Sequence, residues 1–168
     1  MLHDRFVSLA KKLDKETNEQ FMDHEDFENI RELQMNPLGS RIIDAFFADA
    51  AVGDRQRLYF RDFVKVLSHF RPINTAKPHP WNSRDSKLLF AFTMYDLNKS
   101  GTITRDEFRT ILMMMIGKDV PSEQLNEIAE RTMQEADQNQ DGNITFEEFK
   151  KAMEKTDIEQ KMSFRFLK

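Results

Sequence analysis

Two twelve-residue stretches of the sequence carry oxygen-bearing side chains at matching intervals. The first runs from Asp96 to Glu107 and the second from Asp137 to Glu148. Both start with aspartate, share Asn, Gly, Ile and Thr at the third, sixth, eighth and ninth positions, and finish with glutamate. Calcium is a hard cation that takes six to eight oxygen ligands. The spacing therefore predicts that each stretch wraps one calcium ion.

In such a loop the ligands come from positions 1, 3, 5, 7, 9 and 12, and position 7 contributes its backbone carbonyl. The first loop offers Asp96, Asn98, Ser100, Thr102, Thr104 (directly or through water) and Glu107. The second offers Asp137, Asn139, Asp141, Asn143, Thr145 (or water) and Glu148. Gly101 and Gly142 stand at position 6, where the chain must bend sharply. An Asx-rich turn before a helix is the alternative, and the repetition of the whole pattern argues against it.

The two loops differ in their charge. The first has two coordinating carboxylates and the second has three, because Asp141 replaces Ser100 at position 5. More coordinating negative charge tightens calcium binding. We therefore expect two calcium ions per chain, with the tighter one in the second loop.

Helical periodicity flanks both loops. Leu88, Phe92 and Tyr95 recur at spacings of four and three before the first loop, and apolar residues follow at similar spacing after it. Each loop thus belongs to a helix–loop–helix motif of the EF-hand type. The backbones of Ile103 and Ile144 at position 8 should pair in a short two-strand link.

Two fainter copies of the motif precede these, ending at Asp26-Phe27 and Asp62-Phe63. Counting back places Lys15 and Ala51 at position 1, where neither side chain can donate an oxygen, and puts Gln20 and Gln56 in the glycine position. We expect both loops to be metal-silent, although a shifted register starting at Asp14 stays open. Asp49 and Asp54 are expected to be solvated loop charges. The fold class predicted is all-α, with four such motifs in two pairs and a two-strand link between the paired loops.

The prolines Pro72, Pro78 and Pro80 disfavour helix at and just before their own positions. The sequence therefore predicts a first pair over residues 1–70, a linker over 71–86 and a second, calcium-binding pair over 87–168.

Composition narrows the function classes. The chain has 168 residues, 39% of them hydrophobic, a net charge of −4 and no cysteine. These values argue against nucleic-acid binding, and the missing thiols exclude disulfides and a cysteine nucleophile. No apolar run approaches the ~18 residues that a membrane helix needs. We expect a soluble intracellular protein without a small-molecule substrate.

An enzyme is not expected, because the histidines are scattered and no phosphate-binding glycine motif is present. His69 follows the helical stripe of Phe63, Val66 and Leu67, which indicates a residue at a helix end. Calcium is the one cofactor that the sequence indicates.

Three consecutive methionines, Met113, Met114 and Met115, follow the first calcium loop. They span more than half a helical turn, so at least one should be in the core and the others should line a plastic groove for a partner helix. The abundant phenylalanines support this hypothesis. Candidate groove residues, drawn from both pairs, are Phe47, Leu67, Phe92, Leu112, Met113, Met114 and Met115.

Four further segments carry a resemblance to a known family. Residues 35–47, 68–72, 82–84 and 158–167 are similar to the calcineurin B homologous proteins. That resemblance implies four EF-hands with calcium in the last two only. It also implies binding to a juxtamembrane cytoplasmic helix of a plasma-membrane sodium–proton exchanger, and some members inhibit the phosphatase calcineurin.

One departure concerns the start of the sequence. Members of that family begin Met-Gly and are myristoylated, whereas Leu2 follows Met1 here. We therefore expect a cytoplasmic protein that reaches the plasma membrane through its partner. The alternatives left open are a calcium-dependent regulator of a soluble enzyme such as calcineurin, and a calcium buffer without a partner.

Overall fold

A computed structural model describes residues 2–50 and 56–157 of the chain. These residues form two compact units, one ending at Lys87 and the other beginning at Leu88. Each unit is described by itself below. Ala51 and Asp54, and the 158–167 segment that carried part of the family resemblance, lie outside the described residues.

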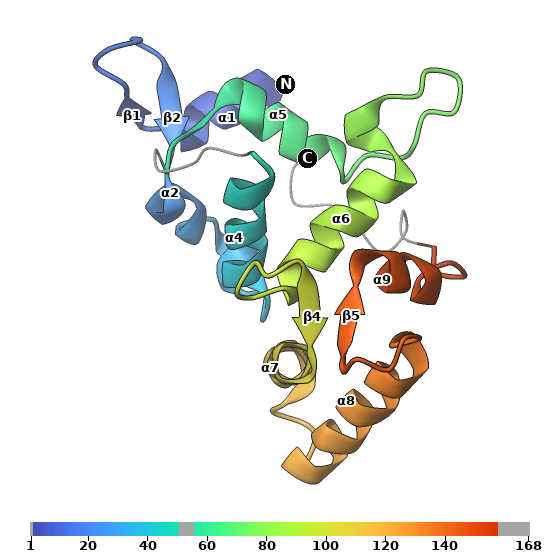
Figure 1. Ribbon diagram of the computed structural model, residues 1–168. Coiled ribbons are helices and arrows are strands. Elements are labelled where there is room, and N and C mark those ends of the chain that lie inside the picture. The colour runs from blue at the N-terminus through green and yellow to red at the C-terminus, as the bar shows by residue number, and fades with distance from the viewer. Residues whose placement is uncertain (1, 51–55, 158–168) are drawn as a thin grey trace. The chain divides into compact units, whose positions relative to one another are not determined.

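The first unit combines short helices with a small sheet (Figure 1). Its elements are α1 (Leu2–Leu9), β1 (Lys12–Leu13), β2 (Gln20–Met22), α2 (His24–Glu28), α3 (Arg31–Gln34), α4 (Gly39–Asp49), β3 (Leu58–Tyr59), α5 (Phe60–Ser68) and the 3-10 helix η2 (Pro80–Asn82). Its core is built from fully buried phenylalanines on different helices. Phe6 and Phe63 lie with ring centroids 5.4 Å apart, and Phe27 and Phe46 with centroids 5.3 Å apart.

The sheet of the first unit has three antiparallel strands in the order β1-β2-β3. Met22 pairs with Leu58, and both side chains are fully buried. This is the two-strand link expected between the first two loops. The additional strand β1, in which Lys12 pairs with Phe21, was not predicted from the sequence.

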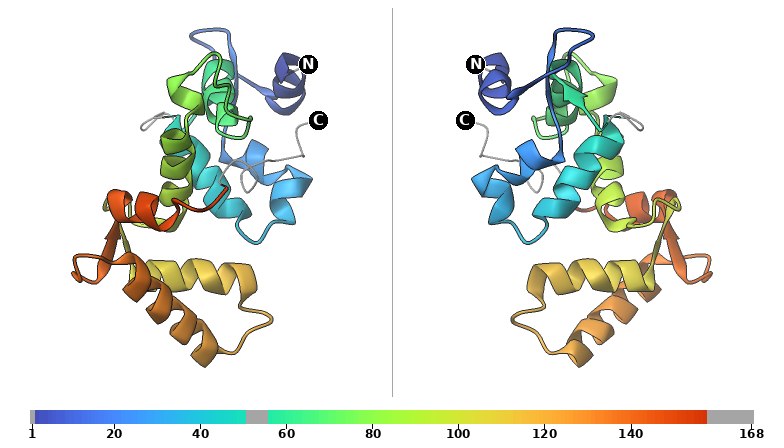
Figure 2. Two further views of the ribbon diagram at one scale, coloured as in Figure 1. Left: turned by 90° about the vertical axis from the view of Figure 1, so that its right-hand side faces the viewer. Right: turned by 90° about the vertical axis from the view of Figure 1, so that its left-hand side faces the viewer.

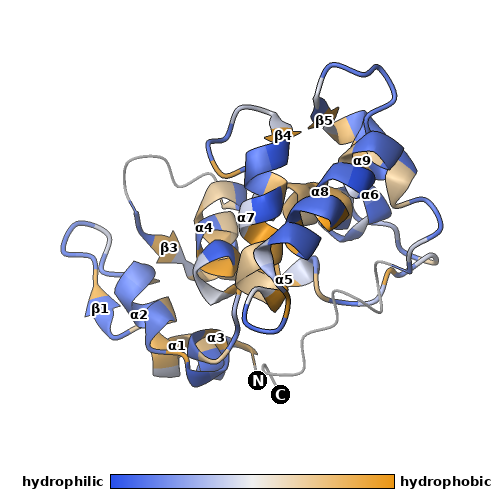
Figure 3. Cartoon of the chain, turned by 90° about the horizontal axis from the view of Figure 1, so that it is seen from below, coloured by the Kyte–Doolittle hydropathy of each residue, from blue (hydrophilic) through white to orange (hydrophobic). Residues whose placement is uncertain are grey.

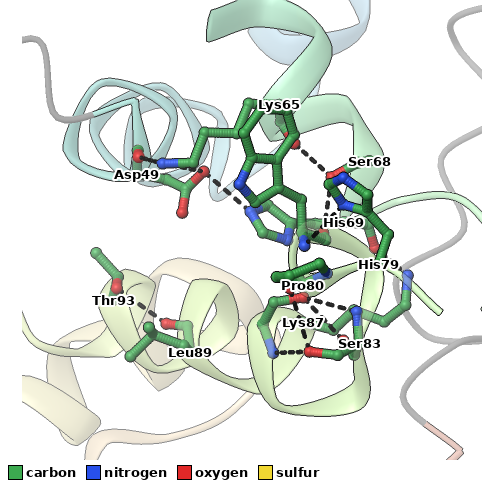
Figure 4. Close-up of polar contacts among 12 residues, drawn as sticks. Asp49, Lys65, Ser68, His69, His79, Pro80, Ser83, Lys87, Leu89 and Thr93 are labelled. Carbon is green, nitrogen blue, oxygen red and sulfur yellow. Dashed lines mark hydrogen bonds and ion pairs between the residues drawn. The ribbon is translucent and has the colours of Figure 1, made fainter.

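The end of α5 is fixed by polar contacts (Figure 4). His69 caps the helix C-terminus, as its position after the apolar stripe indicated, and it is buried. Its Nε2 lies 2.9 Å from Oδ2 of Asp49, and Lys65 donates to the Asp49 carbonyl. Asp49 is therefore a helix-end residue held by two basic side chains, and its prediction as a solvated loop charge was wrong.

The proline-rich segment after α5 is tied at its base. Asn82 Nδ2 donates to the Pro72 carbonyl at 2.8 Å. The buried ammonium of Lys87 donates to the carbonyls of His69 and Arg71 at 2.5 and 2.6 Å. The next helix, α6 (Arg84–Tyr95), begins inside the range 71–86 that was expected to be linker.

The second unit repeats one motif twice (Figures 1 and 2). It consists of the main part of α6, followed by β4 (Thr102–Thr104), α7 (Arg105–Ile116), α8 (Ser122–Ala136), β5 (Asn143–Thr145) and α9 (Phe146–Ala152). Ile103 pairs with Ile144, and both are buried. The expectation of an all-α EF-hand fold with short strand links is confirmed. Among the described helices, none is long and apolar enough to cross a membrane.

A second polar network joins the two loops of the first unit. Asp14 Oδ2 accepts hydrogen bonds from the Tyr59 hydroxyl at 2.5 Å and from Arg57 Nη1 at 2.9 Å. Its Oδ1 accepts from the Glu16 N–H at 2.9 Å. The Asp14 carboxylate is buried, so this network bridges the first loop to β3 from the inside.

We expect Asp14→Asn to destabilise the first unit in a pH-dependent way. The Tyr59 hydroxyl, the Glu16 N–H and Arg57 together lower the pKa of Asp14 from 3.8 to about 2, against the opposing effect of burial. A carboxylate with a lowered folded pKa stabilises fully above its unfolded pKa, and this contribution is lost as pH falls from about 4 toward 2. Urea unfolding of both proteins across this range should show the stability difference shrinking with acid. The control is Glu16→Gln, an exposed side chain outside the network. A difference that is constant with pH would contradict the assignment.

Candidate calcium-binding loops

Helix ends set the positions of both loops. Helix α6 ends at Tyr95, directly before Asp96, and α8 ends at Ala136, directly before Asp137. Gly101 and Gly142 adopt φ of 86° and 85°, a backbone conformation that favours glycine and that their position 6 requires. Figure 3 shows both loops as predominantly hydrophilic segments leading into the two strands.

The first residue of each loop gathers the backbone around its own carboxylate. Asp96 accepts from the N–H groups of Ser100 at 2.9 Å and Gly101 at 2.8 Å. Asp137 does the same with Asp141 at 3.3 Å and Gly142 at 2.8 Å. These bonds hold the loop curved around the aspartate, as a loop that encloses a cation must be.

The last residue of each loop reaches back across it. Glu107 Oε1 accepts from the N–H groups of Leu97 at 3.0 Å and Asn98 at 3.1 Å, and its Oε2 accepts from the N–H and hydroxyl of Thr104 at 2.9 and 2.8 Å. Glu148 repeats all four bonds with the equivalent residues, and the two glutamates are only 7% and 8% exposed. Thr104 and Thr145 are also the N-caps of α7 and α9, each in a capping box with its glutamate. One Thr–Glu pair therefore starts the helix and closes the loop.

Hydrogen bonding keeps both glutamates ionised. Burial raises the pKa of Glu107, but the bonds from Thr104, Asn98 and Leu97 outweigh it and the net pKa is lowered. For Glu148 the backbone N–H and hydroxyl of Thr145 are the main causes of a lowered pKa. A carboxylate that stays charged in a buried place is the ligand that calcium needs at position 12.

The loops differ at position 5 in more than charge. Ser100 Oγ donates to the Thr102 carbonyl at 3.1 Å, and that carbonyl is the predicted ligand of position 7. In the second loop Asp141 instead accepts, from the Asn143 N–H at 2.8 Å and from Asn139 Nδ2 at 2.9 Å. The second loop thus keeps its position-7 carbonyl free of that hydroxyl and adds a carboxylate.

The donor set fits calcium. Within residues 2–50 and 56–157, no group of three or more His, Cys, Asp or Glu side chains is gathered as a metal cluster. In both loops the carboxylates accept hydrogen bonds mainly from backbone N–H groups, and the other expected ligands are amide, hydroxyl and carbonyl oxygens. An oxygen-only set that depends on backbone carbonyls suits a hard cation and gives no site for a thiophilic metal.

The two loops of the first unit align with the calcium loops at the start of the following helix, but they lack several of the calcium ligands. Asp23 and Asp26 form the capping box of α2, in the places that Thr104 and Glu107 hold in α7. Asp62 takes the equivalent third position of α5, after Tyr59. Lys15 is exposed, and Gln56 adopts φ of 47°, where the calcium loops have glycine.

The predicted groove residues have different surroundings. Phe47 and Leu67 lie in the first unit and the others in the second. Leu67 and Phe92 are only 5% and 4% exposed, so both are core residues; Phe92 packs between Phe146 and Phe149. Leu112 and Phe47 are half-buried, and Phe47 stacks on His24. The expected surface role of Leu67 and Phe92 is therefore not seen.

The methionines are the exposed members of that set. Met113, Met114 and Met115 are 46%, 40% and 46% exposed. The expectation that at least one of them is in the core was wrong. The buried side of α7 is formed by Glu107 and Ile111, and the helix extends beyond them.

Comparison with known proteins agrees with this arrangement. Residues 85–154 match the family model of the EF-hand domain pair, which covers both calcium loops and their helices.

Relatives extend the similarity over most of the chain. The type 2 calcineurin B protein of Dictyostelium discoideum is 39% identical over 86% of this chain and 72% of its own length. Calcineurin B of Candida glabrata is 35% identical over 97% of this chain and 86% of its own. Human calcineurin B homologous protein 3 is 35% identical over 99% of this chain and 83% of its own. The chain therefore belongs to the family of EF-hand calcium-binding regulatory proteins that contains calcineurin B and the calcineurin B homologous proteins.

Proposed function

We propose that this protein is a non-enzymatic regulatory subunit that binds two calcium ions in its second unit and an amphipathic helix of a target protein. The observation that carries the calcium part is the pair of loops closed by Glu107 and Glu148, which repeat the same four hydrogen bonds. Calcium, when bound, would supply a charge that orders each loop. Asp96, Asn98, Ser100, Thr102 and Glu107 would hold it in one, and Asp137, Asn139, Asp141, Asn143 and Glu148 in the other.

The two loops of the first unit are proposed to be silent. Lysine at position 1 of the first of them brings a positive charge and no oxygen ligand. The shifted register would need Asp14, but its carboxylate already accepts bonds from Tyr59, Arg57 and the Glu16 N–H. An ion there would have to displace the positively charged guanidinium of Arg57, which lies 2.9 Å from Oδ2 of Asp14.

The target-binding part rests on the methionine cluster (Met113, Met114 and Met115). Exposed methionines next to one another offer an adaptable apolar surface, which suits the apolar face of a helix. Family resemblance favours a juxtamembrane cytoplasmic helix of a sodium–proton exchanger, which would recruit the protein from the cytoplasm to the plasma membrane. The relatives that carry the name calcineurin B favour a helix of a phosphatase as the second candidate.

Calorimetric titration of the whole chain should give two calcium ions. The reason is that only the loops at 96–107 and 137–148 combine aspartate at position 1, glycine at position 6 and glutamate at position 12. Three or four ions per chain would contradict the silent-loop assignment.

Glu148→Gln should weaken overall calcium affinity more than Glu107→Gln does. Asp141 gives the loop at 137–148 an extra carboxylate. We therefore expect Glu148→Gln to weaken overall calcium affinity by about tenfold or more, and Glu107→Gln to weaken it by less. Titrating each single variant isolates the remaining site. Equal affinities for the two remaining sites would refute the charge argument.

A helical peptide of about four turns, carrying Leu, Ile and Phe at helical spacing from an exchanger juxtamembrane segment, should bind and raise calcium affinity. The two effects are linked, because an ion and a peptide that favour the same conformer must tighten each other. Replacing Met113, Met114 and Met115 by Gln should weaken peptide binding by roughly tenfold or more, since several buried apolar groups are lost.

Met35→Gln is the matched control, because Met35 is an exposed methionine (73%) in the first unit. A phosphatase helix is titrated in parallel. If the exchanger peptide neither binds nor shifts calcium affinity while the phosphatase helix does both, the exchanger assignment fails and the phosphatase takes its place.

A further inference from the structure

The end of the first loop of the chain holds a lysine among three carboxylates. Lys12 Nζ lies 2.5 Å from Asp23 Oδ2, 3.1 Å from Glu25 Oε2 and 3.8 Å from Asp26 Oδ2. The Asp26 side chain is only 10% exposed and that of Lys12 is 34% exposed. The cation is therefore partly enclosed by the acids that it contacts.

Two of these acids, Asp23 and Asp26, stand at ligand positions of the intact loops. The capping boxes fix the correspondence: Asp23 and Asp26 hold positions 9 and 12, as Thr104 and Glu107 do in the second unit. The strand link gives the same register, since Met22 pairs with Leu58 as Ile103 pairs with Ile144. Glu25 is at position 11, where the calcium loops also carry an acid.

All three carboxylates lie within 3.8 Å of one ammonium, and its positive charge offsets the repulsion among them. The Lys12 ammonium comes from strand β1, which precedes the loop in the chain. Lys12 belongs to β1 and pairs with Phe21, and the Gln20 side chain donates to the Ala10 carbonyl at 3.0 Å. The Asp14 N–H closes the turn by donating to the Glu19 carbonyl at 2.9 Å. The strand that the sequence did not predict is thus the element that positions the ammonium.

We propose that Lys12 is a built-in cation that replaces calcium in the first unit, neutralising the carboxylates at the end of its loop at every calcium concentration. The first unit is then a scaffold whose loop geometry does not follow the calcium signal. This inference does not depend on which target helix the second unit binds.

The neighbouring silent loop carries fewer acids at the same positions and has less negative charge to neutralise. The loop that ends at Asp62 has Tyr59 at position 9 and Arg61 at position 11, so Asp62 is the one acid among these three positions. It needs no lysine of its own. The protonation behaviour of the first loop agrees as well: the hydrogen bond to Asp23 raises the pKa of Lys12 further above its ordinary value, so the ammonium stays charged.

The test is amide hydrogen exchange on the full chain, with calcium and with chelator. Protection of the amides of residues 20–27 should be the same in both conditions for the unmodified protein. In Lys12→Gln it should fall by about five- to tenfold in both, because a small network of ion pairs exceeds the value of one exposed pair. Lys11→Gln is the matched control: it removes an exposed neighbouring charge that makes no described contact with the acids.

Two further measurements keep the test decisive if Lys12→Gln folds poorly. Lys12→Arg should retain most of the protection, because it keeps the charge. About molar salt should reduce the protection of residues 20–27 in the unmodified protein, because it screens the ammonium–carboxylate attraction. Unchanged protection in Lys12→Gln would overturn the proposal. So would a calcium dependence of residues 20–27 as large as that of residues 96–107.

Discussion

The architecture depends on one hydrogen-bonding arrangement. An acidic residue at the third position of a helix accepts hydrogen bonds from backbone N–H groups of the loop that precedes the helix. In the second unit Glu107 and Glu148 join the start of the loop, its end and the first turn of the next helix through single carboxylates. Removing either carboxylate would leave several part-buried N–H groups without acceptors, which costs more than the loss of one surface bond. Loop shape, helix start and ion affinity are therefore not separable properties here.

The first unit keeps the same frame with shorter acids. Asp26 and Asp62 still bond back to the N-cap N–H, but an aspartate lacks the methylene needed to reach across the whole loop. Side chains from elsewhere take over the missing links. Asp14 accepts hydrogen bonds from Arg57 and Tyr59, and Asp23 forms an ion pair with Lys12. In both units the position-8 residues of the two loops pair and are buried, Met22 with Leu58 and Ile103 with Ile144. The units differ in the cation proposed to neutralise the loop carboxylates, which is a side chain in the first unit and calcium in the second.

Local features of this fold were predictable from the sequence, and long-range features were not. The calcium loops, the register of the silent loops and the Ile103–Ile144 pairing follow from a repeat with fixed spacing. Strand β1 did not, because two residues carry no periodicity. The Asp49–His69 contact joins helices whose approach no local pattern encodes. Burial of Leu67 and Phe92 and exposure of the methionine cluster also depend on where neighbouring helices end, which spacing alone does not give.

The Asp14–Tyr59 contact has a kinetic consequence. Its partners are 45 positions apart in the chain, whereas the helix caps join residues three apart. A contact between residues this far apart forms only after the intervening chain has closed into a loop. That closure costs conformational entropy before the bond contributes any stabilisation, so it slows folding. The first unit should consequently acquire its helices early and its buried bridge late. The nascent chain would then pass through a stage in which helices exist while the two loops are still unjoined.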